Sequence, residues 1–311
     1  MNKRVMVGAA AMVAGAMALR HVGLREDIDW ELAEKPGSVI ELDGYRVHYI
    51  DRGAGPAIVL IHGFGGQTYS FRNILPILER DHRVIAVDLK GYGYSERDAG
   101  AGLSHTDQVA MLKALLEKLG VTHAVFVGHS MGGVIVQRFA AAHPEMVDAL
   151  VLAASGTGEE RFNRRLPPAI LLRPILPVLA RLTAQRLLTA SYYDKSVLTA
   201  DVRAEYNRPA HLIGSMNGLL AIMHDAAQDV PIDVSRITMP VLLLHGADDR
   251  IVPLRASQRI RERLPQARLI VLDRAGHMLL EERPQEAARA ILDFLRDGAP
   301  ARPASVPAAA S

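Results

Sequence analysis

A glycine-flanked serine is the residue of this chain best placed to do chemistry. Ser130 is the third residue of the sequence G-H-S-M-G (128–132), which follows an apolar run and precedes an amphipathic segment, Val134 to Ala142. A strand that turns this sharply into a helix strains the serine backbone, and small neighbours leave room for that strain. The turn lifts the hydroxyl above the sheet edge and brings the amide of Met131 to the helix N-terminus, where negative charge is stabilised. The pattern predicts a nucleophile and half of an oxyanion hole.

A serine hydroxyl needs a base to remove its proton, and the base works best when a carboxylate orients it. Two aspartates, Asp248 and Asp249, follow the apolar run 241–244, and His277 follows the apolar run 268–272. The carboxyl ends of parallel strands meet at one edge of an open α/β sheet, where ligands collect. The residues therefore predict a serine, an acid and a histidine at one edge, with either aspartate as the acid.

The segments that would position these residues alternate between short apolar runs and longer amphipathic stretches. Short apolar runs bounded by turn residues predict strands, and the D-G pair at 43–44 predicts a hairpin. The expected strands are 38–42, 45–51, 57–61, 83–87, 125–128, 149–153, 241–244 and 268–272, and the expected helices are 71–79, 105–119, 134–142, 254–263 and 283–296. This alternation predicts an α/β fold with a mostly parallel central sheet and helices on both faces.

The alternation is interrupted once, and the interruption predicts an inserted helical cap. We expect residues 38–155 to form the first part of the core, 156–236 the cap and 237–297 the second part of the core. Leucines and isoleucines recur at helical intervals between Leu166 and Leu182, and we expect most of them to pack on the core. Arginines 161, 164, 165 and 173 are expected on a solvated face, the alternative being contact with anionic lipid headgroups.

Taken together, the motifs resemble those of the α/β-hydrolase fold superfamily, in particular its serine esterases and lipases, over roughly Val39 to Leu295. The resemblance rests on H-G-F-G (62–65), D-L-K-G-Y-G-Y-S (88–95), G-H-S-M-G-G (128–133), G-A-D-D (246–249) and G-H (276–277), in that order along the chain. It implies that Ser130 is the nucleophile, His277 the base, and the amides of Phe64 and Met131 the oxyanion hole. Family spacing between Gly246 and Pro253 favours Asp249 as the acid, with Asp248 as the alternative.

Other polar residues near these motifs have structural explanations. His62 and His129 are expected to brace their loops by hydrogen bonds rather than to transfer protons. Asp88, at a strand end, is expected to organise a loop. No cofactor is implied, because a G-x-G-x-x-G fingerprint is absent, and no His/Asp/Glu spacing suggests a metal site. Tyr192, Tyr193 and Tyr206 could hydrogen-bond to a substrate, but no spacing selects one of them.

Composition excludes some classes of protein and leaves others open. A net charge of +2 and the lack of basic runs interleaved with aromatic residues argue against nucleic-acid binding. The chain has no Cys, which excludes disulfides and thiolate catalysis. Residues 1–25 contain a short basic region and an apolar run, and are predicted to be a signal peptide or an N-terminal membrane anchor. The protein is therefore expected to be membrane-associated or exported. Residues 298–311, rich in Ala, Pro and Ser, are predicted to be disordered.

These observations predict a hydrolase of carboxylic esters that works through an acyl-enzyme. The apolar cap suggests hydrophobic acyl esters, including monoacylglycerol-like lipids, as substrates. One alternative is a carbon–carbon bond hydrolase of the same fold, although such enzymes often resemble this motif with Asn at the position of His129. The other alternative is a non-catalytic binding protein, which would usually lack a member of the triad. The sequence does not indicate an oligomeric state.

Overall fold

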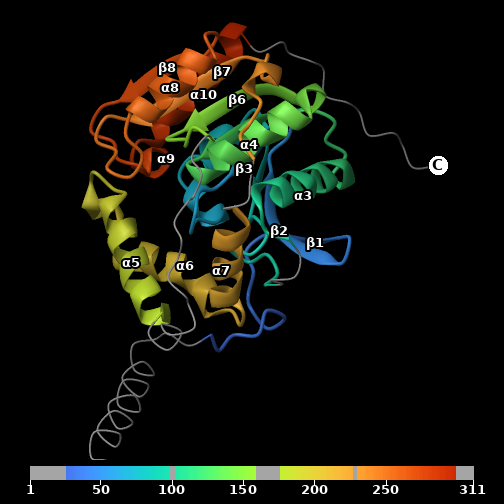
Figure 1. Cartoon of the computed structure of the whole chain (residues 1–311), viewed down its shortest axis with the longest axis vertical. Helices are drawn as coiled ribbons and strands as arrows, with labels where there is room; N and C mark the ends of the chain where they lie inside the picture. Colours follow the sequence, from blue (N-terminus) through green and yellow to red (C-terminus); the bar gives the residue numbers. More distant parts are fainter. Residues whose placement is uncertain (1–25, 98–101, 159–175, 227–229, 299–311) are drawn as a thin grey trace, which may run out of the picture.

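A computed structural model describes residues 26–97, 102–158, 176–226 and 230–298 (Figure 1). It contains an eight-stranded sheet in the order β1-β2-β4-β3-β5-β6-β7-β8. Strands β3 to β8 are mutually parallel, whereas β2 is antiparallel to both β1 and β4. The strands are β1 (Ser38–Leu42), β2 (Tyr45–Arg52), β3 (Ala57–Ile61), β4 (Arg83–Val87), β5 (Ala124–His129), β6 (Val147–Ala153), β7 (Val241–Gly246) and β8 (Arg268–Leu272). The predicted α/β fold is confirmed.

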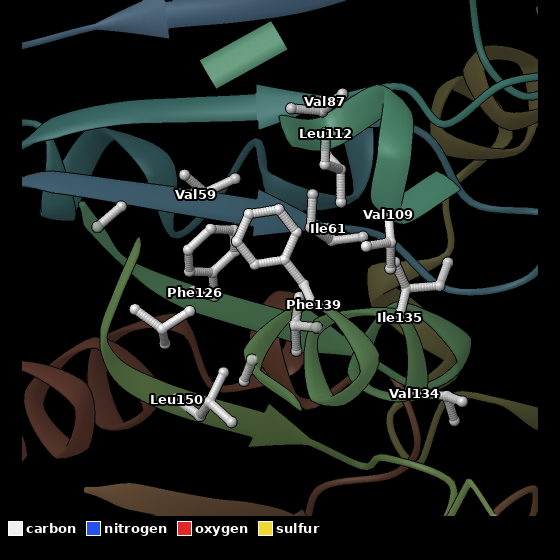
Figure 2. Close-up of a cluster of buried hydrophobic side chains, with 14 of the residues drawn as sticks. Val59, Ile61, Val87, Val109, Leu112, Phe126, Val134, Ile135, Phe139 and Leu150 are labelled. Atoms are coloured by element: carbon white, nitrogen blue, oxygen red, sulfur yellow. The ribbon is translucent and has the colours of Figure 1, made fainter. Parts of the chain in front are cut away.

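Helices cover both faces of the sheet. Helices α3 (His105–Lys118), α4 (Met131–Ala142) and α8 (Arg255–Arg263) pack on one face, and α2 (Leu75–Leu78) and α10 (Pro284–Gly298) on the other. Figure 2 shows the first face, where Phe126 of β5 meets Phe139 of α4 with ring centroids 4.6 Å apart. Both rings are fully buried, which fixes α4, and therefore the serine that precedes it, against the sheet.

The first two strands form the predicted hairpin. Asp43 and Gly44 both have positive φ, 49° and 79°, as a two-residue turn of this kind requires. Ser104 begins α3 as an N-cap, because its hydroxyl accepts a hydrogen bond from the amide of Asp107 and the Asp107 carboxylate accepts one from the amide of Ser104. This reciprocal pair satisfies two donors at the helix start and fixes where the helix begins.

Between β6 and β7 the described chain is helical. It contains α5 (Leu176–Ala190), α6 (Ala200–Asn207) and α7 (Ser215–Ala226), and we refer to residues 176–226 as the cap. In Figure 1 these helices lie together beside the sheet. The predicted leader (1–25), the four arginines and most of the apolar residues named for the cap lie outside the described residues. So does the predicted tail (298–311) except for Gly298, which is the last residue of α10 rather than part of a disordered segment. Among the described residues, no helix has the length and apolar character needed to cross a membrane.

Candidate active site

Ser130 lies at the sharp turn between β5 and α4. Its φ of 54° and ψ of −117° are strained for a residue with a side chain, as the motif predicted. The turn depends on the flanking glycines, since a Cβ at Gly128 would lie 2.5 Å from the carbonyl oxygen of Gly132, and one at Gly132 would lie 2.2 Å from that of Ile61. Helix α4 can therefore approach β5 at Gly128 and β3 at Gly132 closely enough only without those side chains.

His277 and Asp249 are held together by a short hydrogen bond. Nδ1 of His277 lies 2.8 Å from Oδ2 of Asp249, while Oδ1 of Asp249 accepts hydrogen bonds from the amides of Ile251 and Val252 at 2.8 and 2.9 Å. Burial works to raise the pKa of the Asp249 carboxyl, but these hydrogen bonds hold it below its ordinary value. Asp248 is exposed, and its amide bonds to the carbonyl of Ala275. The geometry thus pairs Asp249, not Asp248, with the histidine.

His129 supports His277 from the serine side. Its Nε2 donates a hydrogen bond of 2.8 Å to the carbonyl oxygen of His277, and the two rings lie 4.8 Å apart at their centroids. Burial, reinforced by the neighbouring His277, lowers the pKa of His129 to about 3. A neutral His129 is therefore a brace and does not compete for protons at neutral pH.

His62 braces the loop after β3. Its Nε2 accepts a hydrogen bond from the amide of Leu89, which leaves Nδ1 to donate to the carbonyl of Gly63 at 2.8 Å. Burial lowers the pKa of His62 and keeps the ring neutral. This loop carries Phe64, whose side chain is half exposed and lines the cavity above Ser130. His62 thus braces its own loop as the sequence suggested, whereas His129 bonds to the loop that carries His277.

Asp88 organises the loop that follows β4. The fully buried carboxylate accepts hydrogen bonds from the amides of Thr68 and Tyr94 and pairs with His48. A Cβ at Gly93 would overlap the Asp88 carboxylate, which explains the glycine in this turn. Asp88 thus acts as the loop acceptor expected from its place at a strand end.

A buried histidine that the motifs did not single out lies next to Asp249. His245, at the end of β7, is fully buried, with Nε2 3.0 Å from the carbonyl of Val252 and Nδ1 2.8 Å from the hydroxyl of Ser257. Its Nε2 is also 3.5 Å from Oδ2 of Asp249. Burial lowers the pKa of His245, so the neutral ring holds the loop that carries Asp249. A histidine in place of an apolar residue near the strand end was the only signal in the sequence.

Ser130 and His277 line one cavity between the core and the cap. Its walls include Phe64 from the core and Leu187, Leu188 and other residues of α5 and α6 from the cap. The lining side chains among the described residues are apolar, hydroxyl-bearing, amide-bearing or imidazole groups. The cavity therefore suits a substrate whose bound part is neutral and largely apolar.

The predicted oxyanion residues belong to segments that adjoin the serine: Met131 follows it in the chain, and a Cβ on Gly63, next to Phe64, would lie 2.9 Å from the Cβ of Ser130. Met131 is the first residue of α4, where helix amides have no intrahelical partner. Its sulfur accepts a hydrogen bond of 3.5 Å from the hydroxyl of Tyr92. Phe64 follows β3 in the loop braced by His62. In the part of the chain that the structure describes, no group of three or more His, Asp and Glu side chains could hold a metal ion.

Comparison with known proteins gives the family. Residues 56–284 match the model of the α/β hydrolase fold family. The chain belongs to this family. Over 265 residues it is 34% identical to a 2-hydroxy-6-oxononadienedioate/2-hydroxy-6-oxononatrienedioate hydrolase of Burkholderia vietnamiensis, covering 81% of this chain and 91% of that protein. Over 261 residues it is 30% identical to an uncharacterized hydrolase of Bacillus subtilis, covering 81% and 94%.

A solved structure is similar to this chain over most of its length. The meta-cleavage product hydrolase CumD of Pseudomonas fluorescens superimposes with a TM-score of 0.69 at 26% identity, covering 84% of this chain and 98% of that one. The family match and this superposition confirm the resemblance to the α/β-hydrolase superfamily. They support a hydrolase and leave open which bond the chain cleaves.

Proposed function

We propose that the protein is a serine hydrolase that cleaves carboxylic esters through an acyl-enzyme. The observation that carries this proposal is the arrangement at the cavity: Ser130 at a strained turn, His277 lining the same cavity, and Asp249 hydrogen-bonded to the far side of the His277 ring. Because Asp249 engages Nδ1, Nε2 of His277 is the nitrogen left to act on the serine.

The proposed reaction has two steps that use the same groups. His277 takes the proton of Ser130, and the serine oxygen bonds to the ester carbonyl carbon. The amides of Phe64 and Met131 hold the resulting oxyanion, and one donor of this kind is typically worth about 3–4 kcal/mol of the barrier. His277 then gives its proton to the departing alcohol, which leaves Ser130 acylated. Water, deprotonated by His277, attacks the acyl-enzyme, and the acid departs as Ser130 regains its proton.

Support for a neutral, hydrophobic ester comes from the cavity wall. Leu187 and Leu188 of α5 and Met278 beside the histidine offer apolar contact to an acyl chain. Monoacylglycerol-like lipids combine such a chain with a small neutral alcohol, and we extend the proposal to them. A leader in residues 1–25 would bring the enzyme to a membrane or export it, which is consistent with a lipid substrate.

A second candidate is hydrolysis of a carbon–carbon bond. It is favoured by the relative that is 34% identical and by the meta-cleavage product hydrolase structure, whose names describe that class of reaction. The substrate in the relative's name is a dicarboxylate, which would need a cationic partner, whereas the described lining residues of this cavity are neutral at Leu187, Gln185 and Asn207. We therefore place ester hydrolysis first.

Two assays separate these candidates. Labelling of the intact protein with a fluorophosphonate probe should succeed for wild type and fail for Ser130→Ala. Values of kcat/KM would then be compared for p-nitrophenyl esters of increasing acyl length and for 2-hydroxy-6-oxo-2,4-heptadienoate. We expect the best ester to be the better substrate. Faster turnover of the dienoate would transfer the assignment to carbon–carbon cleavage, and equal absence of labelling in both proteins would favour a non-catalytic role.

A further inference from the structure

A short segment of the cap lies directly on the loop that carries His277. The amide of Met278 donates a hydrogen bond of 3.1 Å to the carbonyl of Ser191, which follows α5. A Cβ placed on Gly276 would lie 2.6 Å from the amide nitrogen of Tyr193 and 2.7 Å from the carbonyl oxygen of Ser191. The cap backbone and the histidine loop therefore meet so closely that only glycine fits between them.

One carboxylate joins these two segments. Glu282 belongs to helix α9 (Leu279–Glu282), which begins just after the histidine. Its Oε1 accepts a hydrogen bond from the amide of Gly276 at 2.9 Å, and its Oε2 accepts from the amides of Tyr193 and Asp194, both at 2.9 Å. A charged acceptor makes stronger hydrogen bonds than a neutral one, so this link is stronger than a backbone contact alone.

The other contacts of His277 show what this link adds. Asp249 orients the ring through Nδ1, and His129 holds the carbonyl of His277 from the side of β5. Glu282 fixes the preceding residue, Gly276, and so holds the peptide on the N-terminal side of the histidine. The Glu282 carboxylate thereby links the peptide before His277 to the cap.

We propose that Glu282 is a positioning residue that aligns His277 with Ser130 by binding the Gly276 amide and the cap segment Ser191–Asp194 at the same time. The proposal rests on the proposed function and adds a dependence of the base on the cap. Displacement of the cap segment would shift the histidine loop through the shared carboxylate. A misplacement of about 1 Å at a catalytic group can cost about 100-fold in rate.

The test compares Glu282→Ala and Glu282→Gln with wild type. Ala removes the whole link. Gln keeps the shape but has only one acceptor oxygen, so it can accept hydrogen bonds from the amide of Gly276 or from the cap amides but not from both. Glu286→Ala is the matched control, because Glu286 is an exposed carboxylate on the first turn of α10. The readouts are the second-order rate of fluorophosphonate labelling, kcat and KM on a short p-nitrophenyl ester, and the thermal midpoint.

Measured well below each variant's thermal midpoint, Glu282→Ala should label at least about ten-fold more slowly than wild type. Its kcat should fall by a similar factor with a smaller change in KM, Glu282→Gln should fall between Ala and wild type, and Glu286→Ala should match wild type. A lower thermal midpoint with unchanged labelling rate and kcat would overturn the proposal, since Glu282 would then be structural only. If Glu282→Ala does not fold, wild-type rates in Glu282→Gln would overturn it equally. Failure of wild type to label would instead count against the proposed function.

Discussion

Removal of Arg72 should destabilise the fold, because it would leave a buried carboxylate between the core and the cap without its cation. Nη1 of Arg72 lies 2.7 Å from Oε2 of Glu281, whose side chain is 1% exposed. The same carboxylate accepts hydrogen bonds from the hydroxyls of Tyr192 and Tyr206, which come from the cap. The Arg72 guanidinium also stacks on Tyr69, 4.4 Å from the ring centroid. Arg72→Met would leave Glu281 without its cation and with only neutral partners.

The expected loss follows from that burial. Removing one partner of a buried ion pair typically costs about 3–5 kcal/mol, because the remaining charge is uncompensated. For a domain of this size each kcal/mol lowers Tm by about 2 °C, so Arg72→Met should melt roughly 6–10 °C below wild type. An exposed arginine offers the control: Arg289→Met, on α10, should change the free energy of unfolding by less than about 0.5 kcal/mol.

The dependence on pH identifies the mechanism. Burial raises the pKa of Glu281 even beside Arg72, so the stability linked to its protonation is present below the ordinary Glu pKa and is lost as pH rises through the raised value. Without Arg72 that pKa rises further, and the deficit of Arg72→Met should be larger at pH 8 than at pH 5. Circular dichroism melts at both pH values measure this difference.

The double variant decides whether the buried charge is the cause. Arg72→Met with Glu281→Gln removes both charges, keeps an acceptor for the tyrosine hydroxyls, and should recover most of the lost Tm at pH 8. A double variant no more stable than Arg72→Met, or a single variant that loses less than about 1 kcal/mol at both pH values, would refute the reasoning.

Two further predictions concern the histidines and the acid. Asp249→Asn should reduce kcat by about 10³ to 10⁴-fold with little change in KM, because a neutral amide cannot stabilise the imidazolium. Asp248 is exposed, and Asp248→Asn should retain near wild-type kcat. If Asp248→Asn lost more activity than Asp249→Asn, the two aspartates would exchange roles. His129, with its pKa near 3 in the folded state, should make the free energy of unfolding decline as pH falls below about 6.5, since only the unfolded chain takes up that proton. His129→Gln, which can keep the donor to the carbonyl of His277, should show a shallower decline in urea titrations between pH 7.5 and 5, and an identical slope would contradict this account.

The strands and the main helices of the core could be predicted because each is decided by local pattern. The run Ala57–Ile61 is apolar throughout and forms β3 with four of its residues fully buried, as expected of a central parallel strand. The helix expected at 71–79 is instead a 3₁₀ turn, Thr68–Phe71, followed by the short α2, because Pro76 restricts where a regular helix can start. Sequence spacing also placed Ser130, Asp249 and His277 at the ends of β5, β7 and β8, and their chemical roles stay predictions.

The contacts that the sequence did not predict are those between distant segments. Helix α9 is only four residues long, Leu279–Glu282, and gives no periodic signal, yet both of its glutamates contact the cap. Glu281 meets residues more than 70 positions away, and Glu282 residues almost 90 positions away. Two adjacent acidic residues in a sequence normally indicate a solvated surface. Only the fold shows that one of them is buried.

The cavity wall and the family match bear on the substrate in different ways. The family match covers residues 56–284, core and cap alike, and establishes a hydrolase without fixing which bond is cleaved. Among the described residues, the wall that α5 and α6 contribute presents Leu187, Leu188 and the neutral amides of Gln185 and Asn207. We expect these wall residues to influence which substrate is bound. Exchange of Gln185 for Arg, at the wall of the cavity, would test this directly: if the wall selects the substrate, the ratio of dienoate to ester turnover should rise while fluorophosphonate labelling of Ser130 persists.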